Sequence, residues 1–307
     1  MKYAEFVKKS HEYRLMSAEA KNPASGYLLV GKDGVFTDIL YKLFLSEMLG
    51  ISVLSVESNA DIEIFEGKFA VADAEKIAEK AYYTPVSLPK KFFVIKCGEN
   101  INEAAQNKLL KILEEPPRST GFLLIAKEES YLLPTVRSRL KIVRCRPMAD
   151  EDINDLCAKY LDNAFVSAAL SGGSIERAEK FSSPEYAELY REVLAMLFNM
   201  KKSGDILGYA SALNSKREMI PDVLDIIETV FHDCMMCSLG IYDGFMLKMS
   251  TSEIKDLSSG YGVDAVLKLR PVVDRARKRL ATGGNASSVI DEVLFSILEV
   301  KAKCQKL

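Results

Sequence analysis

The sequence predicts an α/β domain built on a parallel sheet, followed by a segment that is entirely helical. Between residues 27 and 146, short apolar segments alternate with segments of helical periodicity, the pattern of a parallel sheet covered by helices on both faces. Pro147 ends this alternation, and beyond Ser183 only helical spacing recurs. The 307 residues also exceed what a single hydrophobic core usually supports. We therefore expect more than one domain.

The individual elements follow from local patterns of apolar residues. A polar helix covers 4–20 and precedes the first strand. The expected strands are 28–30, 62–65, 92–95, 122–126 and 142–145. Small helices are expected between 151 and 181, and longer ones at 186–200, 206–213, 221–239, 265–280 and 287–303. Pro271 predicts a kink or a boundary in one of them. The resulting domains are 1–147, 148–183 and 184–307.

The segment 103–117, with the sequence EAAQNKLLKILEEPP, is the most informative part of the chain. Its apolar residues recur at helical spacing, which predicts an amphipathic helix. Asn102 provides a cap for the free N–H groups of the first turn, and Glu103 places negative charge at the positive end of the helix dipole. Pro116 and Pro117 cannot continue a helix, so the helix ends before them.

This helix, the strand after it and the segment Ser138-Arg139-Leu140 resemble the AAA+ clamp-loader family. In that family an Asn-Ala-Leu-Leu-Lys-x-Leu-Glu-Glu-Pro-Pro helix is followed by a Ser-Arg-Cys motif. The resemblance is strong over 27–146, weaker to 181 and only general beyond. It implies an AAA+ α/β domain with a parallel sheet and flanking helices, then a small helical lid, then an all-α collar domain that holds subunits in a ring.

The phosphate loop of the family is altered here. The family pattern is Gly-x-x-Gly-x-Gly-Lys-Thr/Ser, and only Gly31 and Gly34 match it. Phe36 stands in place of the last glycine, Thr37 in place of the lysine, and Asp38 in place of the hydroxyl that binds Mg²⁺. Phosphate binding needs a glycine for close backbone approach and a lysine for the terminal phosphates. A bulky ring and an extra carboxylate oppose both requirements.

The other ATP-contacting positions of the family are altered as well. Lys96 takes the place of the Mg²⁺-coordinating aspartate and Cys97 that of the adjacent glutamate, while Glu99 reads as a loop charge. The segment 171–178 resembles the Gly-Ser turn of the family's lid domain. In that turn, Glu176 takes the place of an arginine that reaches the nucleotide. Arg177 could substitute in a shifted register, but an exposed helix charge is the simpler interpretation. Hydrolysis of ATP by this chain is therefore not expected.

Arg139 corresponds to the residue that members of the family insert into the ATP site of the neighbouring subunit. A guanidinium suits that role, since it stays charged and presents a rigid fork to phosphate oxygens. Ser138 belongs to the same motif, and Leu140 replaces its cysteine. The alternative is that Arg139 is a surface charge at the end of a loop, as neighbouring Arg137 could be.

Composition agrees with a cytoplasmic protein that needs no cofactor or metal. The net charge of −2 does not indicate strong independent binding of nucleic acid. No apolar run approaches the ~20 residues that span a bilayer, and residues 1–5 lack the apolar core of a signal peptide. Six cysteines at irregular spacing indicate reduced thiols. Cys234 and Cys237 form a CxxC in an apolar helical stretch, where core packing is the better interpretation.

Three functions remain open at this point. The first is a non-hydrolysing subunit that supports a hetero-oligomeric ring and supplies Arg139 to a neighbouring ATPase subunit while a sliding clamp is loaded onto DNA. Its partners would be gamma/tau-type and delta-type subunits, with the clamp and primer-template DNA contacted indirectly. The second is an ATP-hydrolysing motor subunit with a divergent phosphate loop. The third is a stand-alone nucleic-acid-binding module, for which a basic stripe or stacking aromatics would be the sign.

Overall fold

The computed structural model describes residues 1–96, 100–242, 245–246 and 251–304. The chain forms two compact units. The first comprises Met1–Leu156 together with Gly173–Glu176, and the second comprises Cys157–Gly172 together with Arg177–Leu307. The predicted three-part division at 147 and 183 stays a prediction.

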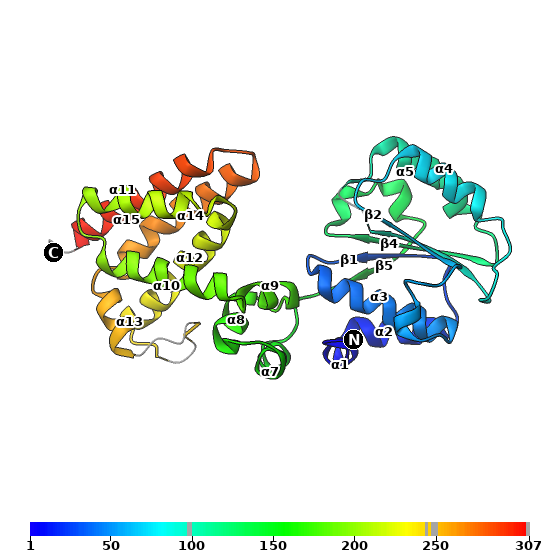
Figure 1. Ribbon diagram of the computed structural model, residues 1–307, viewed down its shortest axis with the longest axis horizontal. Helices are drawn as coiled ribbons and strands as arrows, with labels where there is room; N and C mark the ends of the chain where they lie inside the picture. Colours follow the sequence, from blue (N-terminus) through cyan, green and yellow to red (C-terminus); the bar gives the residue numbers. More distant parts are fainter. Residues whose placement is uncertain (97–99, 243–244, 247–250, 305–307) are drawn as a thin grey trace. The chain divides into compact units, whose positions relative to one another are not determined.

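The first unit is built on five parallel strands, as the sequence predicts (Figure 1). They are β1 (Gly26–Val30), β2 (Ile62–Glu66), β3 (Lys91–Lys96), β4 (Thr120–Ala126) and β5 (Lys141–Arg144). Their order in the sheet is β2-β3-β4-β1-β5. Leu28 of β1 lies opposite Leu124 of β4 on one side and Ile142 of β5 on the other. Each predicted strand is confirmed, with its ends displaced by no more than two residues.

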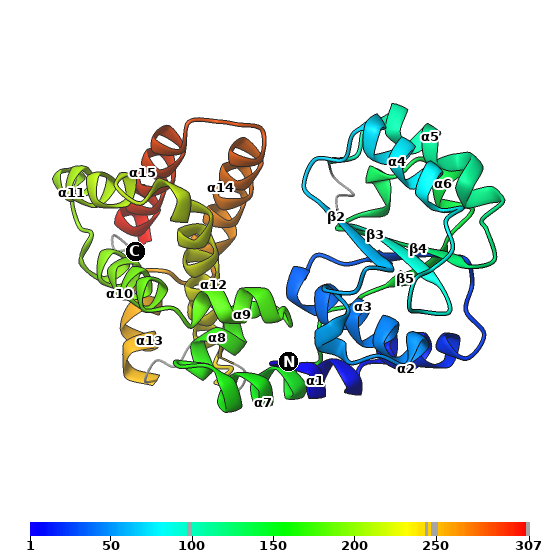
Figure 2. The same cartoon turned by 45° about the vertical axis from the view of Figure 1, so that its right-hand side comes forward.

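Helices cover both faces of this sheet, which Figures 1 and 2 show from two directions. One face carries α1 (Ala4–Lys9), α2 (His11–Ala20) and α3 (Gly34–Leu49), and the other carries α4 (Val71–Lys80) and α5 (Glu103–Glu114). The single helix predicted over 4–20 is wrong in one respect, because it is interrupted at Ser10. The Ser10 hydroxyl accepts a hydrogen bond from the Tyr13 N–H at 3.1 Å and so caps a new helix.

The α5 helix has the predicted bounds and the predicted cap. The Asn102 side-chain oxygen accepts from the Ala105 N–H at 2.8 Å, and the helix ends before the two prolines. Its apolar face is buried in the core beside the sheet, through Ala105, Leu109, Ile112 and Leu113. A one-turn helix, α6 (Pro134–Arg137), follows β4, and short 3-10 turns lie at Val53–Ser55 and Glu129–Tyr131.

The part of the chain described beyond β5 is helical, as predicted. Its α-helices are α7 (Asp150–Tyr160), α8 (Ala164–Ser171), α9 (Ile175–Phe181), α10 (Pro184–Asn199), α11 (Ser203–Asn214), α12 (Ile220–Ser238), α13 (Thr251–Ser258), α14 (Val263–Ala281) and α15 (Ala286–Cys304), and Arg217–Met219 is a 3-10 turn. Pro271 lies inside α14, so a helix boundary at that residue is wrong. A proline removes one hydrogen bond, and the packing of α14 against α12 and α15 outweighs that loss.

The second unit has a large apolar core to which helices from α8 to α15 contribute. Cys234 and Cys237 are buried in α12 and contribute to this interior, which confirms the core interpretation of the CxxC. Burial raises the pKa of Cys234 to about 12, so its thiol stays protonated and unreactive at neutral pH. Among the residues that the structure describes, every helix is too short or too polar to cross a bilayer.

Candidate functional site

The altered ATP-contacting residues converge at the carboxyl ends of neighbouring strands. Gly31 follows β1, Lys96 ends β3, and Lys127 follows β4. In open α/β sheets this edge, at the point where the strand order reverses, is where ligands bind. The described residues enclose a cavity of about 170 Å³ there. That volume is below the ~300–1,000 Å³ of typical small-molecule pockets.

The loop between β1 and α3 is too short to surround phosphates. The helix starts at Gly34, only three residues after Gly31 begins the loop. A phosphate loop needs several free backbone N–H groups between the strand and the helix, and here Phe36 and Thr37 already lie in the first helical turn. Gly31 serves packing instead, since a Cβ on it would lie 2.8 Å from the Cβ of Cys145.

The two residues that replace the family's glycine and lysine both turn inward. The Phe36 ring is buried, with 2% of the residue exposed. The Thr37 hydroxyl donates to the backbone carbonyls of Asp33 and Gly34 at 3.0 and 3.1 Å. Neither side chain is directed to bind a phosphate group.

Carboxylates occupy the N-terminus of α3, the position that the resemblance assigns to phosphate binding. Asp33 is the N-cap of α3, and its side chain accepts from the Phe36 N–H at 3.0 Å. Glu176 accepts from the Gly34 N–H at 2.8 Å. Burial raises the pKa of Asp33, although hydrogen bonds from backbone N–H groups of Phe36 and Ile175 oppose that rise. Positive helix ends favour such negative groups.

Lys96 forms a second charged cluster beside this helix end. Its ammonium lies 2.7 Å from Asp38 and 2.7 Å from Glu66, and Asp38 also pairs with Lys42 at 2.6 Å. Burial alone would lower the pKa of Lys96, but the hydrogen bonds to Asp38 and Glu66 outweigh it and raise that pKa above its usual value. Lys96 is therefore a fixed cation at the end of β3, the position that the resemblance assigns to Mg²⁺ binding. Cys97 and Glu99 lie outside the described residues.

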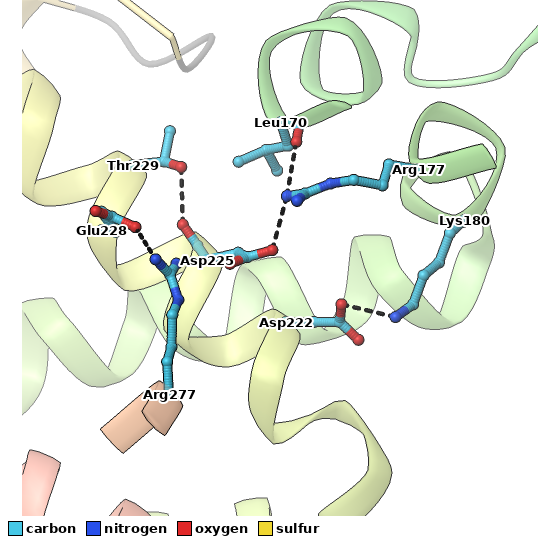
Figure 3. Close-up of polar contacts among 8 residues, drawn as sticks. All are labelled: Leu170, Arg177, Lys180, Asp222, Asp225, Glu228, Thr229 and Arg277. Atoms are coloured by element: carbon cyan, nitrogen blue, oxygen red, sulfur yellow. Dashed lines mark hydrogen bonds and ion pairs between the residues drawn. The ribbon is translucent and has the colours of Figure 1, made fainter. Parts of the chain in front are cut away.

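Arg177 does not take over the role of a nucleotide-binding arginine. Figure 3 shows its guanidinium between the Leu170 carbonyl and the Asp225 carboxylate, at 3.1 and 2.7 Å. Arg277 from α14 pairs with the other oxygen of Asp225 at 2.6 Å. Lys180, one turn along α9, pairs with Asp222 at 2.7 Å. These contacts fasten α9 to α12 within the second unit, so Arg177 is a structural ion-pair residue.

The turn that carries Arg139 is held by a compact set of hydrogen bonds. The N–H groups of Ser138 and Arg139 continue the turn of α6 by donating to Pro134 and Val136 carbonyls. The Ser138 hydroxyl donates to the Thr135 carbonyl at 3.0 Å. Ser138 therefore shapes the turn.

Leu140, at the position of the family's cysteine, is buried. A Cβ on Gly26 would lie 2.6 Å from its side chain. The glycine in β1 thus leaves room for the Leu140 side chain.

The Arg139 side chain is folded back onto the protein but remains partly open. Nη1 donates to the Thr135 carbonyl at 2.7 Å, and Nη2 to Glu114 at 3.0 Å. The side chain is 28% exposed. A guanidinium has five N–H donors, so these two contacts leave donors for another ligand. Arg137, in the same turn, pairs instead with Glu129 at 3.5 Å.

A buried glutamine also joins α5 to the segment leading into α6. Gln106 accepts from the Leu133 N–H at 2.7 Å and donates to the Tyr131 carbonyl at 3.0 Å. The α5 helix thus contacts the segment before α6 through Gln106 and contacts Arg139 itself through Glu114.

Three residues of this site were not predicted from the sequence: Asp33, Glu66 and Glu114. Asp33 has a local signal, because an aspartate before a helical segment is a strong N-cap candidate. Glu66 and Glu114 have no such signal. Their partners Lys96 and Arg139 lie 30 and 25 residues away along the chain, and only the folded sheet brings them together.

Comparisons with known proteins show what the chain is similar to. The family model described as DNA polymerase III, delta subunit, matches residues 10–149. The delta' subunit of DNA polymerase III from Bacillus subtilis (strain 168) is 21% identical over 239 residues, covering 74% of this chain and 72% of that protein. The gamma/tau subunit from Mycobacterium bovis is 36% identical over 96 residues, covering 31% of this chain. The match spans only 17% of the length of that gamma/tau relative.

A solved structure extends the likeness to the whole fold. A DNA polymerase III gamma subunit-related protein from Thermotoga maritima superposes with a TM-score of 0.55, covering 94% of this chain and 99% of that chain. The sequence identity is 15%, so this likeness shows the fold alone.

The five-stranded parallel sheet, the α5 helix and the Arg139 motif agree with the resemblance to the AAA+ clamp-loader class. The chain is similar to the delta' subunits of DNA polymerase III, and the matching family model covers residues 10–149. The resemblance predicted from the motifs is confirmed.

Proposed function

We propose that this chain is a non-hydrolysing subunit of a DNA polymerase III clamp-loader complex and supplies Arg139 to the ATP site of a neighbouring subunit. The observation that carries the proposal is the contrast between its two candidate sites. At the chain's own candidate nucleotide site the Gly34 N–H and the Lys96 ammonium are already bonded to carboxylates of the chain, whereas Arg139 is partly exposed with donors to spare. Such a subunit contributes to ATP hydrolysis only in trans.

The closed phosphate loop supports the non-hydrolysing part of the proposal. Gly34 lies in the helix, Phe36 is buried, and Lys96 repels a divalent cation at the metal position. Catalysis of phosphoryl transfer depends on positioning and on neutralising charge at the phosphates. None of these residues provides either. The alternative, a motor subunit with a divergent loop, predicts micromolar binding of Mg²⁺-ATP, which titration of a fluorescent ATP analogue measures.

The geometry around Arg139 supports the trans-acting part. The hydrogen-bonded turn and the contacts to Thr135 and Glu114 hold the fork at the surface. Preorganisation of this kind reduces the entropy lost when the guanidinium meets a phosphate. Residues 184–307 would hold the subunit in the ring as its collar, next to gamma/tau-type and delta-type partners. Contact with the sliding clamp and primer-template DNA would be indirect.

Substitution of Arg139 in the reconstituted complex tests the proposal. Comparable trans-acting arginines are worth ~10³–10⁵ in rate at the site they touch. A ring has several ATP sites, so we expect Arg139→Ala to slow DNA-stimulated ATP turnover and clamp loading by a smaller factor overall. Arg139→Lys should rescue poorly, because an ammonium lacks the planar fork.

Arg137→Ala is the matched control for this experiment. Arg137 belongs to the same turn, is ion-paired in the same way, and has a side chain that is 31% exposed. Its removal should leave turnover unchanged. If Arg139→Ala assembles normally and every ATP site turns over at the wild-type rate, the trans-acting role is wrong.

A further inference from the structure

Two of the first backbone N–H groups of α3 are bonded by side chains of the chain itself. The first N–H groups of any helix have no partner within the helix, and in a phosphate loop such groups bind the nucleotide. Here the Gly34 N–H donates to Glu176 at 2.8 Å, and the Phe36 N–H donates to Asp33 at 3.0 Å. A free anion would have to displace both carboxylates.

Asp33 makes the contact reciprocal. Its second oxygen accepts from the Ile175 N–H at 2.6 Å, and its first oxygen also accepts from the Glu176 N–H at 3.4 Å. Ile175 and Glu176 are the first residues of α9. The start of each helix thus receives a carboxylate from the other segment, which satisfies backbone donors on both sides.

The segment Gly173–Glu176 is tied down at its other end as well. The Gly173 carbonyl accepts from the Met148 N–H at 2.8 Å. Gly173 has a φ of +78°, and a Cβ there would lie 2.6 Å from the Met148 carbonyl oxygen, so only glycine fits this close approach. These hydrogen bonds explain why Gly173–Glu176 belongs to the first unit, although the residues on either side of it belong to the second.

A cation completes the arrangement. Lys96 places an ammonium 2.7 Å from both Asp38 and Glu66. Its side chain is 17% exposed, so water screens these contacts only partly. The positive group on the strand end and the negative groups at the helix end reproduce the charges that a bound cation and phosphate would bring.

We propose that the nucleotide site is ligated by the chain itself: Asp33 and Glu176 stand in for phosphate and hold Gly173–Glu176 on the β1–α3 loop without a nucleotide, while Lys96, bound to Asp38 and Glu66, stands in for the metal ion. The inference deepens the proposed non-hydrolysing function, since it supplies a reason why the subunit needs no ATP to order this segment. The segment is then held constitutively, and the state of bound nucleotide cannot switch it.

We call the hydrogen bonds of Asp33 and Glu176 that join the two helix starts the carboxylate lock. Hydrogen exchange of the isolated full-length chain, measured by mass spectrometry, tests this lock. Glu176→Ala removes the acceptor of the Gly34 N–H, while Glu176→Gln keeps an acceptor but loses the charge. Hydrogen bonds to charged groups are among the stronger ones in proteins. We therefore expect exchange in peptides covering 31–37 and 173–181 to rise about tenfold in Glu176→Ala and less in Glu176→Gln.

Glu185→Ala is the matched control, because Glu185 is an exposed acidic residue in the first turn of α10. It removes the same charge from a helix start outside the lock, and exchange in the two peptides should stay at the wild-type rate. Asp33→Asn is a second test of the lock. An amide can still cap Phe36 but offers no second acceptor to Ile175, so exchange should rise in 173–181.

The lock also predicts the response to nucleotide. Millimolar Mg²⁺-ATP should leave exchange of the wild-type 31–37 peptide unchanged. Protection of that peptide by Mg²⁺-ATP overturns the proposal, as does exchange in Glu176→Ala that equals the Glu185→Ala control. This measurement needs no partner subunit, so its failure is distinct from a failure of the Arg139 test in the assembled complex.

Discussion

Replacing Lys96 by methionine should destabilise the first unit while leaving its fold intact. Methionine keeps much of the length and apolar volume of lysine, and it can pack on the Tyr41 ring that the Lys96 ammonium now overlies at 4.8 Å. The change therefore removes the charge with little loss of packing. It leaves Asp38 and Glu66 without the cation that they share.

The magnitude follows from the exposure of the two partners. Asp38 is 33% exposed and keeps its contact with Lys42, so the loss there should be about 1.5 kcal/mol, the lower end for a hydrogen bond to a charged group. Glu66 is 63% exposed, and exposed ion pairs contribute about 0.5 kcal/mol. We expect a total loss of about 2 kcal/mol.

Urea unfolding followed by circular dichroism measures this loss, with Lys68→Met as the control. Lys68 is exposed and lies two residues beyond Glu66, so its substitution should stay within about 0.5 kcal/mol of the wild type. Lys96→Asp should lose more stability than Lys96→Met, because three carboxylates then converge, and millimolar Ca²⁺ should recover part of the loss. If Lys96→Met matches the control, or if Ca²⁺ has no effect on Lys96→Asp, the ammonium does not act as the cation of this site.

Two further predictions concern other carboxylates of the first unit. Asp61→Ala should lower the free energy of unfolding by about 3 kcal/mol, since three partly buried hydrogen bonds are lost at about 1 kcal/mol each. Their donors are the N–H groups of residues 86–88, at 2.7–2.9 Å from Asp61. Burial opposes ionisation of Asp61, but these N–H groups hold its pKa below the usual value. Its contribution to the free energy of unfolding is therefore complete above about pH 4 and is lost as pH falls through the folded pKa. Acid titration of the wild type should show this loss of stability, and acid titration of Asp61→Ala should not. Glu114→Gln should change stability by less than about 0.5 kcal/mol, because Glu114 is 60% exposed. In the assembled complex it should slow ATP turnover a few-fold by loosening Arg139, and unchanged turnover would show that Glu114 does not position that residue.

Local features of the sequence were sufficient for the fold class. The five strands are short apolar segments separated by helical periodicity, and all five form one parallel sheet. Both ends of the α5 helix were predictable, since Asn102 provides a side-chain acceptor at its start and two prolines follow its last turn. Such signals act between neighbours in the chain, so they are visible without knowledge of the fold. The interruption at Ser10 and the continuity of α14 through Pro271 were not predicted, because packing outweighs these weaker local preferences.

The sequence also predicts which ATP-contacting residues are replaced, but it could not say what the replacements do. A phenylalanine or a lysine at a known position shows that a function is altered, and the motif around Arg139 indicates what is retained. Neither reveals that Phe36 enters the core or that Lys96 acquires two carboxylate partners.

Only the tertiary structure decided how the charges of the site are paired. Glu176 reaches Gly34 across 142 residues of sequence, and Glu114 reaches Arg139 across 25. Each contact depends on the order of strands in the sheet and on the side-chain conformation that burial allows. A charge in the sequence has many candidate partners, and the energy of an ion pair depends on distance and desolvation, which exist only once the chain has folded.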